Sequence, residues 1–143
     1  MKRNALLVCL IIALAMGCLK SGRARKRDQQ SPLTSPSGEF VLTMPIEKDT
    51  TRRNFSYWHV TISDTNGKVV YKDTKSDFVG HLNVYWTWDQ DDRVWLYNSD
   101  DATVWFWEQA DGAWTKNKYG YGRTKEIDRE IAPPEKFYND HVR

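Results

Sequence analysis

The chain has 143 residues, of which 40% are hydrophobic and 28% charged, with a formal net charge of +2. The positive charge is confined to the N-terminal part, because from Ser35 onward 14 Lys and Arg stand against 18 Asp and Glu, a net charge of −4. Without a basic stripe in that larger part, the composition argues against a nucleic-acid-binding protein.

The first 17 residues predict an export signal. Lys2 and Arg3 precede an uncharged, mostly apolar run from Asn4 to Met16. This run is shorter than the roughly 20 apolar residues that cross a bilayer as a helix. A basic start, a short apolar run and small residues at its end are typical of a signal peptide. We therefore expect residues 1–17 to be removed and the mature protein to be exported.

The end of this leader, Ala15-Met16-Gly17-Cys18, resembles the lipobox of bacterial lipoproteins. The resemblance implies cleavage before Cys18, lipidation of its sulfur with an acyl chain such as palmitate, and a membrane anchor. Leu19 is not the Asp that retains such proteins in the inner membrane, so the resemblance points to the outer membrane if the source is Gram-negative. Ala15 and Gly17 also satisfy an ordinary signal peptidase site, which leaves a soluble secreted or periplasmic protein as the alternative.

Residues 18–38 predict a lipidated cysteine followed by a disordered basic tether. The segment is rich in Ser, Pro, Gly and Gln, and five Lys and Arg between Lys20 and Arg27 stand beside one acid, Asp28. Such a composition does not bury enough apolar surface to fold. Because Cys9 leaves with the leader, no disulfide can form within the mature chain, and residues 39–143 depend on their core alone.

Residues 39–143 predict one all-β domain of about seven short strands with a short C-terminal helical segment. Apolar alternation marks strands at residues 39–44, 57–63, 68–73, 83–88, 93–98, 103–108 and 113–116. Turn sequences rich in Asp, Asn and Gly separate them, including Asn66-Gly67, a strong hairpin signal. Short strands at this spacing favour an antiparallel meander, as a curled sheet or a sandwich. Ile127 and Ile131, four residues apart, predict a brief helix over residues 125–131.

Residues 80–108 resemble a β-propeller blade of the WD40 type. Gly80-His81 stands where the family has its Gly-His pair, and Trp107-Glu108 stands in place of the Trp-Asp pair. The resemblance implies a scaffold for protein partners. A blade takes roughly 40–45 residues and a closed ring at least about four blades, so this domain is too short for a propeller. We expect a local similarity within a small sheet.

The candidate binding site is aromatic. The sequence alternation places Trp95, Tyr97, Trp105 and Trp107 on one face of two neighbouring strands and the more aliphatic residues Val94, Leu96, Val104 and Phe106 on the other. If the aliphatic face packs inward, the four aromatic residues form an exposed platform, and exposed aromatic patches mark binding sites. We expect them to bind a partner protein or an envelope glycan such as peptidoglycan. The alternative is that both faces are covered and the aromatic residues are core.

Metal binding and catalysis have little support in the sequence. The acidic turns at residues 89–92 and 99–102 do not match the EF-hand spacing, and Asp in turns usually caps backbone amides. His59, His81 and His141 are scattered, and neither an HExxH helix nor a Gly-x-Ser-x-Gly elbow is present. We predict no metal, no cofactor and no enzymatic activity.

These observations favour a non-enzymatic lipoprotein of the cell envelope whose Trp-rich domain binds a partner protein or a glycan. One alternative is a secreted or periplasmic inhibitor, or an immunity-type protein, that acts on an envelope-active enzyme such as a lysozyme. Another is a hydrolase that uses His59 or His81 with the acidic turn residues.

Overall fold

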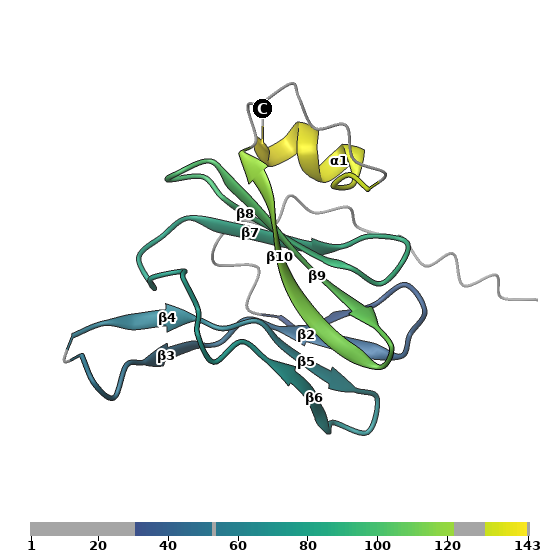
Figure 1. Cartoon of the computed structure of the whole chain (residues 1–143), viewed down its shortest axis with the longest axis horizontal. Helices are drawn as coiled ribbons and strands as arrows, with labels where there is room; N and C mark the ends of the chain where they lie inside the picture. Colours follow the sequence, from purple (N-terminus) through teal and green to yellow (C-terminus); the bar gives the residue numbers. More distant parts are fainter. Residues whose placement is uncertain (1–30, 53, 122–130, 143) are drawn as a thin grey trace, which may run out of the picture.

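The computed structural model describes residues 31–52, 54–121 and 131–142, which fold as two four-stranded antiparallel sheets and a separate two-stranded hairpin (Figure 1). The first sheet, in the order β1-β2-β5-β6, contains β1 (Leu33–Thr34), β2 (Phe40–Thr43), β5 (Thr61–Asp64) and β6 (Val69–Lys72). The second, in the order β10-β9-β8-β7, contains β7 (Val84–Trp88), β8 (Val94–Asn98), β9 (Thr103–Ala110) and β10 (Ala113–Tyr121). The hairpin pairs β3 (Ile46–Lys48) with β4 (Ser56–Trp58). A short helix, α1 (Glu135–Phe137), continues into a π-helical turn, η2 (Tyr138–Val142).

The prediction of an all-β antiparallel fold with a short C-terminal helix is confirmed, and the two sheets form a sandwich. The structure has ten strands rather than about seven, because β1 and β3 were not expected and the predicted strand 57–63 is divided into β4 and β5. The helix lies at residues 135–137, and the predicted helix over residues 125–131 falls almost entirely outside the described residues. In the described part of the chain, no helix is long and apolar enough to cross a membrane.

The ordered domain begins before residue 39, so its start overlaps the segment expected to be a tether. Leu33 pairs with Leu42 in the first sheet, and Ser35 is buried. The indole Nε1 of Trp88 donates a hydrogen bond to the Leu33 carbonyl at 2.9 Å. These contacts with the sandwich outweigh the polar composition of residues 31–38, of which Leu33–Thr34 form an edge strand. The signal peptide, Cys18 and the rest of the tether lie outside the described residues.

The turns form where the sequence predicted them. Asp side chains in these turns accept hydrogen bonds from backbone amides. In the β5–β6 turn, Asp64 Oδ1 accepts bonds from the amides of Asn66 and Lys68, and Gly67 has a φ of 82°. In the β7–β8 turn, Asp89 Oδ1 accepts bonds from the amides of Asp91 and Arg93. This capping role is the one expected for turn Asp residues.

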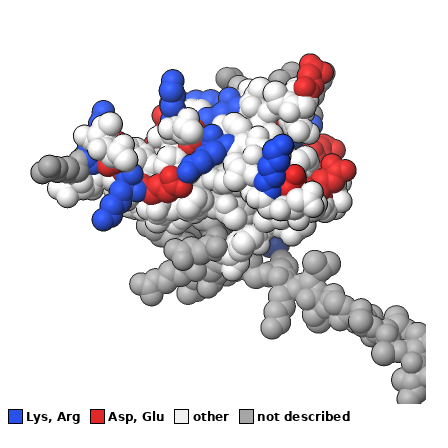
Figure 2. Space-filling view, turned by 90° about the horizontal axis from the view of Figure 1, so that it is seen from below, with Lys and Arg blue, Asp and Glu red and all other residues white. Residues whose placement is uncertain are grey.

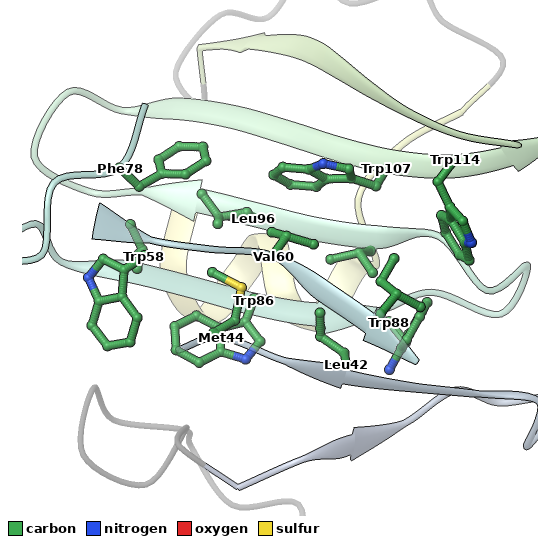
Figure 3. Packing of buried hydrophobic residues seen from close by; sticks show 13 residues of the cluster. Leu42, Met44, Trp58, Val60, Phe78, Trp86, Trp88, Leu96, Trp107 and Trp114 are labelled. Carbon is green, nitrogen blue, oxygen red and sulfur yellow. The ribbon is translucent and has the colours of Figure 1, made fainter. Parts of the chain in front are cut away.

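The main core fills the space between the two sheets and is dominated by indole rings (Figure 3). Leu42, Val60 and Ile62 are fully buried on the side of the first sheet. The hairpin and the second sheet contribute Trp58, Trp86, Trp88, Trp107 and Trp114, which lie in the same layer (Figure 3). Large aromatic side chains bury enough apolar area to support a small domain of this size without a disulfide.

A second core lies on the other face of the second sheet, beneath α1 (Figure 1). Phe137 of α1 is buried there against aromatic residues of the sheet, and all five residues of β8 are buried. His141 stacks on Tyr85 with ring centroids 4.3 Å apart. The second sheet is therefore covered on both faces.

Backbone hydrogen bonds join the hairpin to the sandwich where β4 meets residues 78–80. The Trp58 amide donates to the Phe78 carbonyl at 2.8 Å, and the Gly80 amide donates to the Ser56 carbonyl at 2.6 Å. A Cβ atom at Gly80 would lie 2.5 Å from Ser56 Oγ and 3.2 Å from the Ser56 carbonyl oxygen, so a larger residue would require the Ser56 side chain to move. Beyond this junction, the hairpin extends past the end of the two sheets (Figure 1).

Candidate functional site

The predicted aromatic platform does not form, because the strand register places its four residues on opposite faces of the second sheet. Asn98 pairs with Thr103 across the β8–β9 turn, so odd-numbered residues of β8 lie opposite even-numbered residues of β9. Trp95 consequently pairs with Phe106, whereas Trp105 pairs with Leu96. Residues that pair directly share a face. Trp95 and Tyr97 therefore face α1, and Trp105 and Trp107 face the first sheet.

Burial also corrects the expectation of an exposed platform. Trp95 and Trp107 are fully buried and Tyr97 is 4% exposed, so three of the four residues belong to the cores, as the alternative interpretation expected. Trp105 is partly buried, with the ammonium groups of Lys116 and Lys118 lying 5.0 and 5.5 Å from the centroid of its ring. Of the four residues, Trp105 alone retains surface that a ligand can reach.

Lys116 of β10 lies in a half-buried cluster at the side of the sandwich. Its Nζ is 2.8 Å from Asp73 Oδ2 and 2.9 Å from Asp77 Oδ2, and it lies 5.1 Å from the centroid of the Phe78 ring. Burial lowers the pKa of Lys116, but the hydrogen bonds and charges of the two carboxylates outweigh it, so the net direction is upward. The charges in this cluster are mutually compensated, and they join the segment after β6 to the second sheet.

Arg93 organises a second charged cluster, which we call the acidic end. Its guanidinium is 3.2 Å from Asp89 Oδ2, 3.0 Å from Asp91 Oδ2 and 3.4 Å from Glu108 Oε2. Asp89 Oδ2 also accepts a hydrogen bond from the buried indole Nε1 of Trp95 at 2.8 Å. In residues 31–52, 54–121 and 131–142, no three His, Cys, Asp or Glu side chains are grouped so as to hold a metal ion. The acidic end is thus a structural ion cluster that secures the β7–β8 turn.

A polar hollow lies between the β3–β4 hairpin and the segment after β6, and we call it the hairpin groove. It has a volume of about 560 Å³ and is lined by residues 47–52, Tyr57, His59 and residues 74–76. Glu47 and Tyr57 pair directly across the hairpin, so their side chains share the face that lines the groove. The groove is therefore built by a strand pair on one wall and an irregular segment on the other.

Both carboxylates of the hairpin groove are held by the chain itself. Glu47 accepts two hydrogen bonds from Lys72 Nζ, at 2.7 and 2.9 Å, and this interaction lowers the pKa of Glu47. Asp49 Oδ1 accepts bonds from the hydroxyl and the amide of Thr51 and from the amide of Arg52, and the Thr51 hydroxyl is the main cause that lowers the pKa of Asp49. Glu47 is therefore paired with Lys72, whereas Asp49 is held by its own loop and its charge also interacts with Arg52.

The cations of the groove, in contrast, are unpaired. Lys48, Arg52 and Lys75 are exposed and form no ion pair within 4 Å with any described residue. Lys48 and Arg52 belong to the hairpin, whereas Lys75 belongs to the opposite wall. An anionic ligand in the groove would meet positive charge from both sides.

His59 lines the groove with one ring nitrogen fixed. Nδ1 lies 2.6 Å from the Asp73 carbonyl oxygen, and because a carbonyl only accepts, Nδ1 carries the hydrogen. In the neutral ring, Nε2 is then the acceptor. Ser76, on the same groove, donates its hydroxyl to the Trp58 carbonyl and accepts a bond from the Phe78 amide, so this hydroxyl is engaged with the backbone.

Sequence reasoning missed the hairpin groove. Residues 47–52 form a polar run, Glu47-Lys-Asp-Thr-Thr-Arg52, for which no site was predicted. Residues 46–48 pair with residues 56–58, and the groove also includes residues 74–76. The local sequence pattern does not predict these tertiary contacts. The useful signal was the density of hydroxyl and basic side chains in the run.

Comparison with protein families, curated proteins and solved structures finds no match to this chain. The likenesses to a lipobox and to a propeller blade therefore rest on their own residues alone.

Proposed function

We propose that this chain is a non-enzymatic lipoprotein of the cell envelope that binds a partner protein or an envelope glycan through the hairpin groove. The leader and the lipobox-like residues 15–18 support export and anchoring at Cys18. Two or more acyl chains give stable membrane anchoring, whereas one holds a protein weakly.

The observation that carries the proposal is the set of unpaired cations in the hairpin groove. Lys48, Arg52 and Lys75 line a hollow of about 560 Å³ in a domain whose net charge is −4. Elsewhere on the described surface, Lys116 and Arg93 are each paired with two or more carboxylates. Unpaired charge concentrated in a hollow supports a binding role.

The side chains of the groove favour binding over hydrolysis. His59 is oriented by a backbone carbonyl, and no hydrogen bond between His59 and a described carboxylate is present. The Ser76 hydroxyl donates to the backbone. A general base needs a nucleophile within hydrogen-bond reach, and the Ser76 hydroxyl is committed to the backbone.

Expression of the full chain with its leader in a bacterial host tests this proposal. We expect the protein in the membrane fraction, with mass spectrometry showing a lipidated Cys18 at the new N-terminus. We also expect the lipidated protein, in detergent, to sediment with purified peptidoglycan sacculi. An unmodified Cys18 in the soluble fraction would contradict anchoring, and a protein that sediments with neither sacculi nor any envelope protein would contradict binding.

A second candidate function is inhibition of an envelope-active enzyme, and the shape of the hairpin supports it. The hairpin extends beyond the sheets, and Ile46 and Phe55 on it are 44% and 46% exposed (Figure 1). Exposed apolar residues on a projecting element suit insertion into another protein. Titration of lysozyme with the chain tests this: loss of turnover at equimolar ratio, restored by Phe55→Ser, would favour the inhibitor.

A further inference from the structure

We infer that the hairpin groove binds the anionic groups, carboxylate or phosphate, of an envelope glycan. This inference rests on the proposed function and names the chemistry that the groove selects. Three features carry it: the placement of the unpaired cations, the neutral donors between them, and the lack of apolar wall.

The cations are placed on both walls, and none of them lies within 4 Å of a carboxylate of the described residues. Arg52 lines the groove from the hairpin and Lys75 from the segment after β6, whereas Lys48, which alternates with Glu47 along β3, lines both this groove and a second hollow with Phe55 and Ser56. The nearest acids are already held, since Glu47 accepts from Lys72 and Asp49 accepts from its own loop. Hydrogen bonds from ammonium or guanidinium groups to carboxylate or phosphate are about twice as strong as neutral ones. The groove thus offers charge-assisted bonds that the protein does not itself use.

Between the cations lie neutral groups that suit a sugar. Thr50 and Thr74 carry hydroxyls that both donate and accept, and His59 presents a ring whose Nδ1 is fixed. Tyr57 adds an aromatic ring on the same hairpin face as Glu47. Sugar rings offer hydroxyls and apolar C–H faces, so hydroxyl donors beside an aromatic ring are the partners they need. A small inorganic anion would leave most of this wall unused.

The composition of the groove walls favours a glycan ligand over a protein partner. Protein interfaces have apolar centres that are depleted in charged residues. The hairpin groove has the opposite composition, since no aliphatic side chain lines it and the exposed Ile46 and Phe55 lie outside it. Figure 2 shows Lys and Arg side chains at the hairpin end of the molecule, with Asp and Glu side chains among them. The groove therefore favours a charged polymer.

The ligand test uses matched probes with the full lipidated chain in detergent micelles, measured by isothermal titration calorimetry. The carboxylate probe is a disaccharide-peptide fragment of peptidoglycan, and its control is the same fragment with the carboxylates converted to amides. Polyglycerol phosphate is the phosphate probe, and an N-acetylglucosamine oligomer is the neutral control. We expect at least one anionic probe to bind about tenfold or more tightly than the amidated and neutral controls, and its affinity to fall with added salt. The probe that binds identifies the source of the anion.

The site test compares two charge-matched double variants. Lys48→Gln with Lys75→Gln removes two groove cations, whereas Lys68→Gln with Lys136→Gln removes two cations elsewhere. We expect the first pair to weaken binding of the anionic probe by about tenfold or more, which is the scale of one charge-assisted hydrogen bond. The second pair should change it by less than about twofold. Equal loss in both pairs would show that only the overall charge matters and would overturn the inference.

Failure of this inference is distinguishable from failure of the proposed function. If the chain sediments with sacculi but amidation and the groove pair leave binding unchanged, the anionic site is wrong and envelope binding stands. If the chain is soluble with an unmodified Cys18 and yet the anionic probe binds through the groove, anchoring is wrong and the site stands. A protein partner whose binding depends on Ile46 and Phe55 and is unaffected by the groove pair would also overturn the inference.

Discussion

The hairpin groove and the acidic end carry similar numbers of charged side chains, but they differ in whether those charges are already paired. At the acidic end, Arg93 contacts three carboxylates, and Asp89 also accepts a bond from Trp95. In the hairpin groove, Lys48, Arg52 and Lys75 contact none among the described residues. Figure 2 shows basic and acidic side chains at both ends of the molecule, so the two regions differ in pairing and not in the sign of their charge alone.

This difference separates charges that stabilise the fold from charges that are available to a ligand. A cluster with buried members is costly to disrupt, because removal of one partner leaves another unsatisfied. Exposed, unpaired side chains contribute little to stability. The two regions should therefore respond in opposite ways to substitution.

The largest effect is expected for Asp89→Ala. This change removes the acceptor of the buried Trp95 indole and a partner of Arg93, while the Asp89 side chain itself is only 10% exposed. We expect a loss of about 3 kcal/mol in the free energy of unfolding, measured by urea denaturation. Asp89→Asn, which keeps an acceptor oxygen, should lose less. If Asp89→Ala were as stable as the wild type, the charges of the acidic end would not be structural, and this region would not differ from the hairpin groove.

The second effect concerns Lys116→Met, which leaves the 6% exposed Asp73 side chain without its ion pair. We expect a loss of about 2 kcal/mol at neutral pH. Because the pKa of Lys116 is raised by folding, its stabilisation is present below the ordinary lysine value of about 10.4 and is lost as pH rises through the folded value. Denaturation midpoints between pH 8 and pH 11, in wild type and variant, should therefore converge toward high pH.

A smaller, pH-dependent effect is expected at His141, which packs between Tyr85 and Phe137. Burial is the main cause that lowers its pKa below 6.5, with Asp140 opposing and Lys136 adding to the shift. The unfolded chain then binds a proton more readily, so stability falls as pH falls from 6.5 through the folded value. We expect the Tm to drop by a few degrees between pH 7.5 and pH 5.5. His141→Phe should show a smaller drop, and an equal one would contradict the assignment.

The smallest effect on stability is expected in the hairpin groove. Lys48→Ala, Arg52→Ala and Lys75→Ala should each change the free energy of unfolding by less than about 0.5 kcal/mol, as exposed substitutions usually do. The same urea denaturation used for Asp89 measures this. A loss above about 1 kcal/mol at any of the three would show that its charge is structural.

Local sequence patterns were sufficient for the fold class and for the turns. Period-two alternation predicted the strands, and Asp64, Gly67 and Asp89 play the turn roles that their chemistry favours. The face of the sheet on which each residue lies was harder to predict. The four-residue β8–β9 turn places odd-numbered residues of β8 opposite even-numbered residues of β9, and alternation within each strand does not reveal this pairing. This is why Trp95 and Trp105 were assigned to one face.

Local sequence patterns could not predict the hairpin groove, for a different reason. Its hairpin strand β3 has only three residues and follows Pro45, so it is too short to show a period. Its second wall, residues 74–76, comes from a segment that is distant in sequence and has no regular structure. A site built from such pieces depends on tertiary placement.

Gly80 has a consequence for how the protein can change over evolutionary time. A larger side chain there would require the Ser56 hydroxyl to move and would crowd Ile46 and the Ser56 carbonyl, all on the hairpin. In the loop at residues 49–52, Asp49 holds the backbone, whereas the exposed side chains of Thr50 and Arg52 are free to vary. We expect homologues to share the glycine and to vary the loop, so that different members hold one shape and select different ligands.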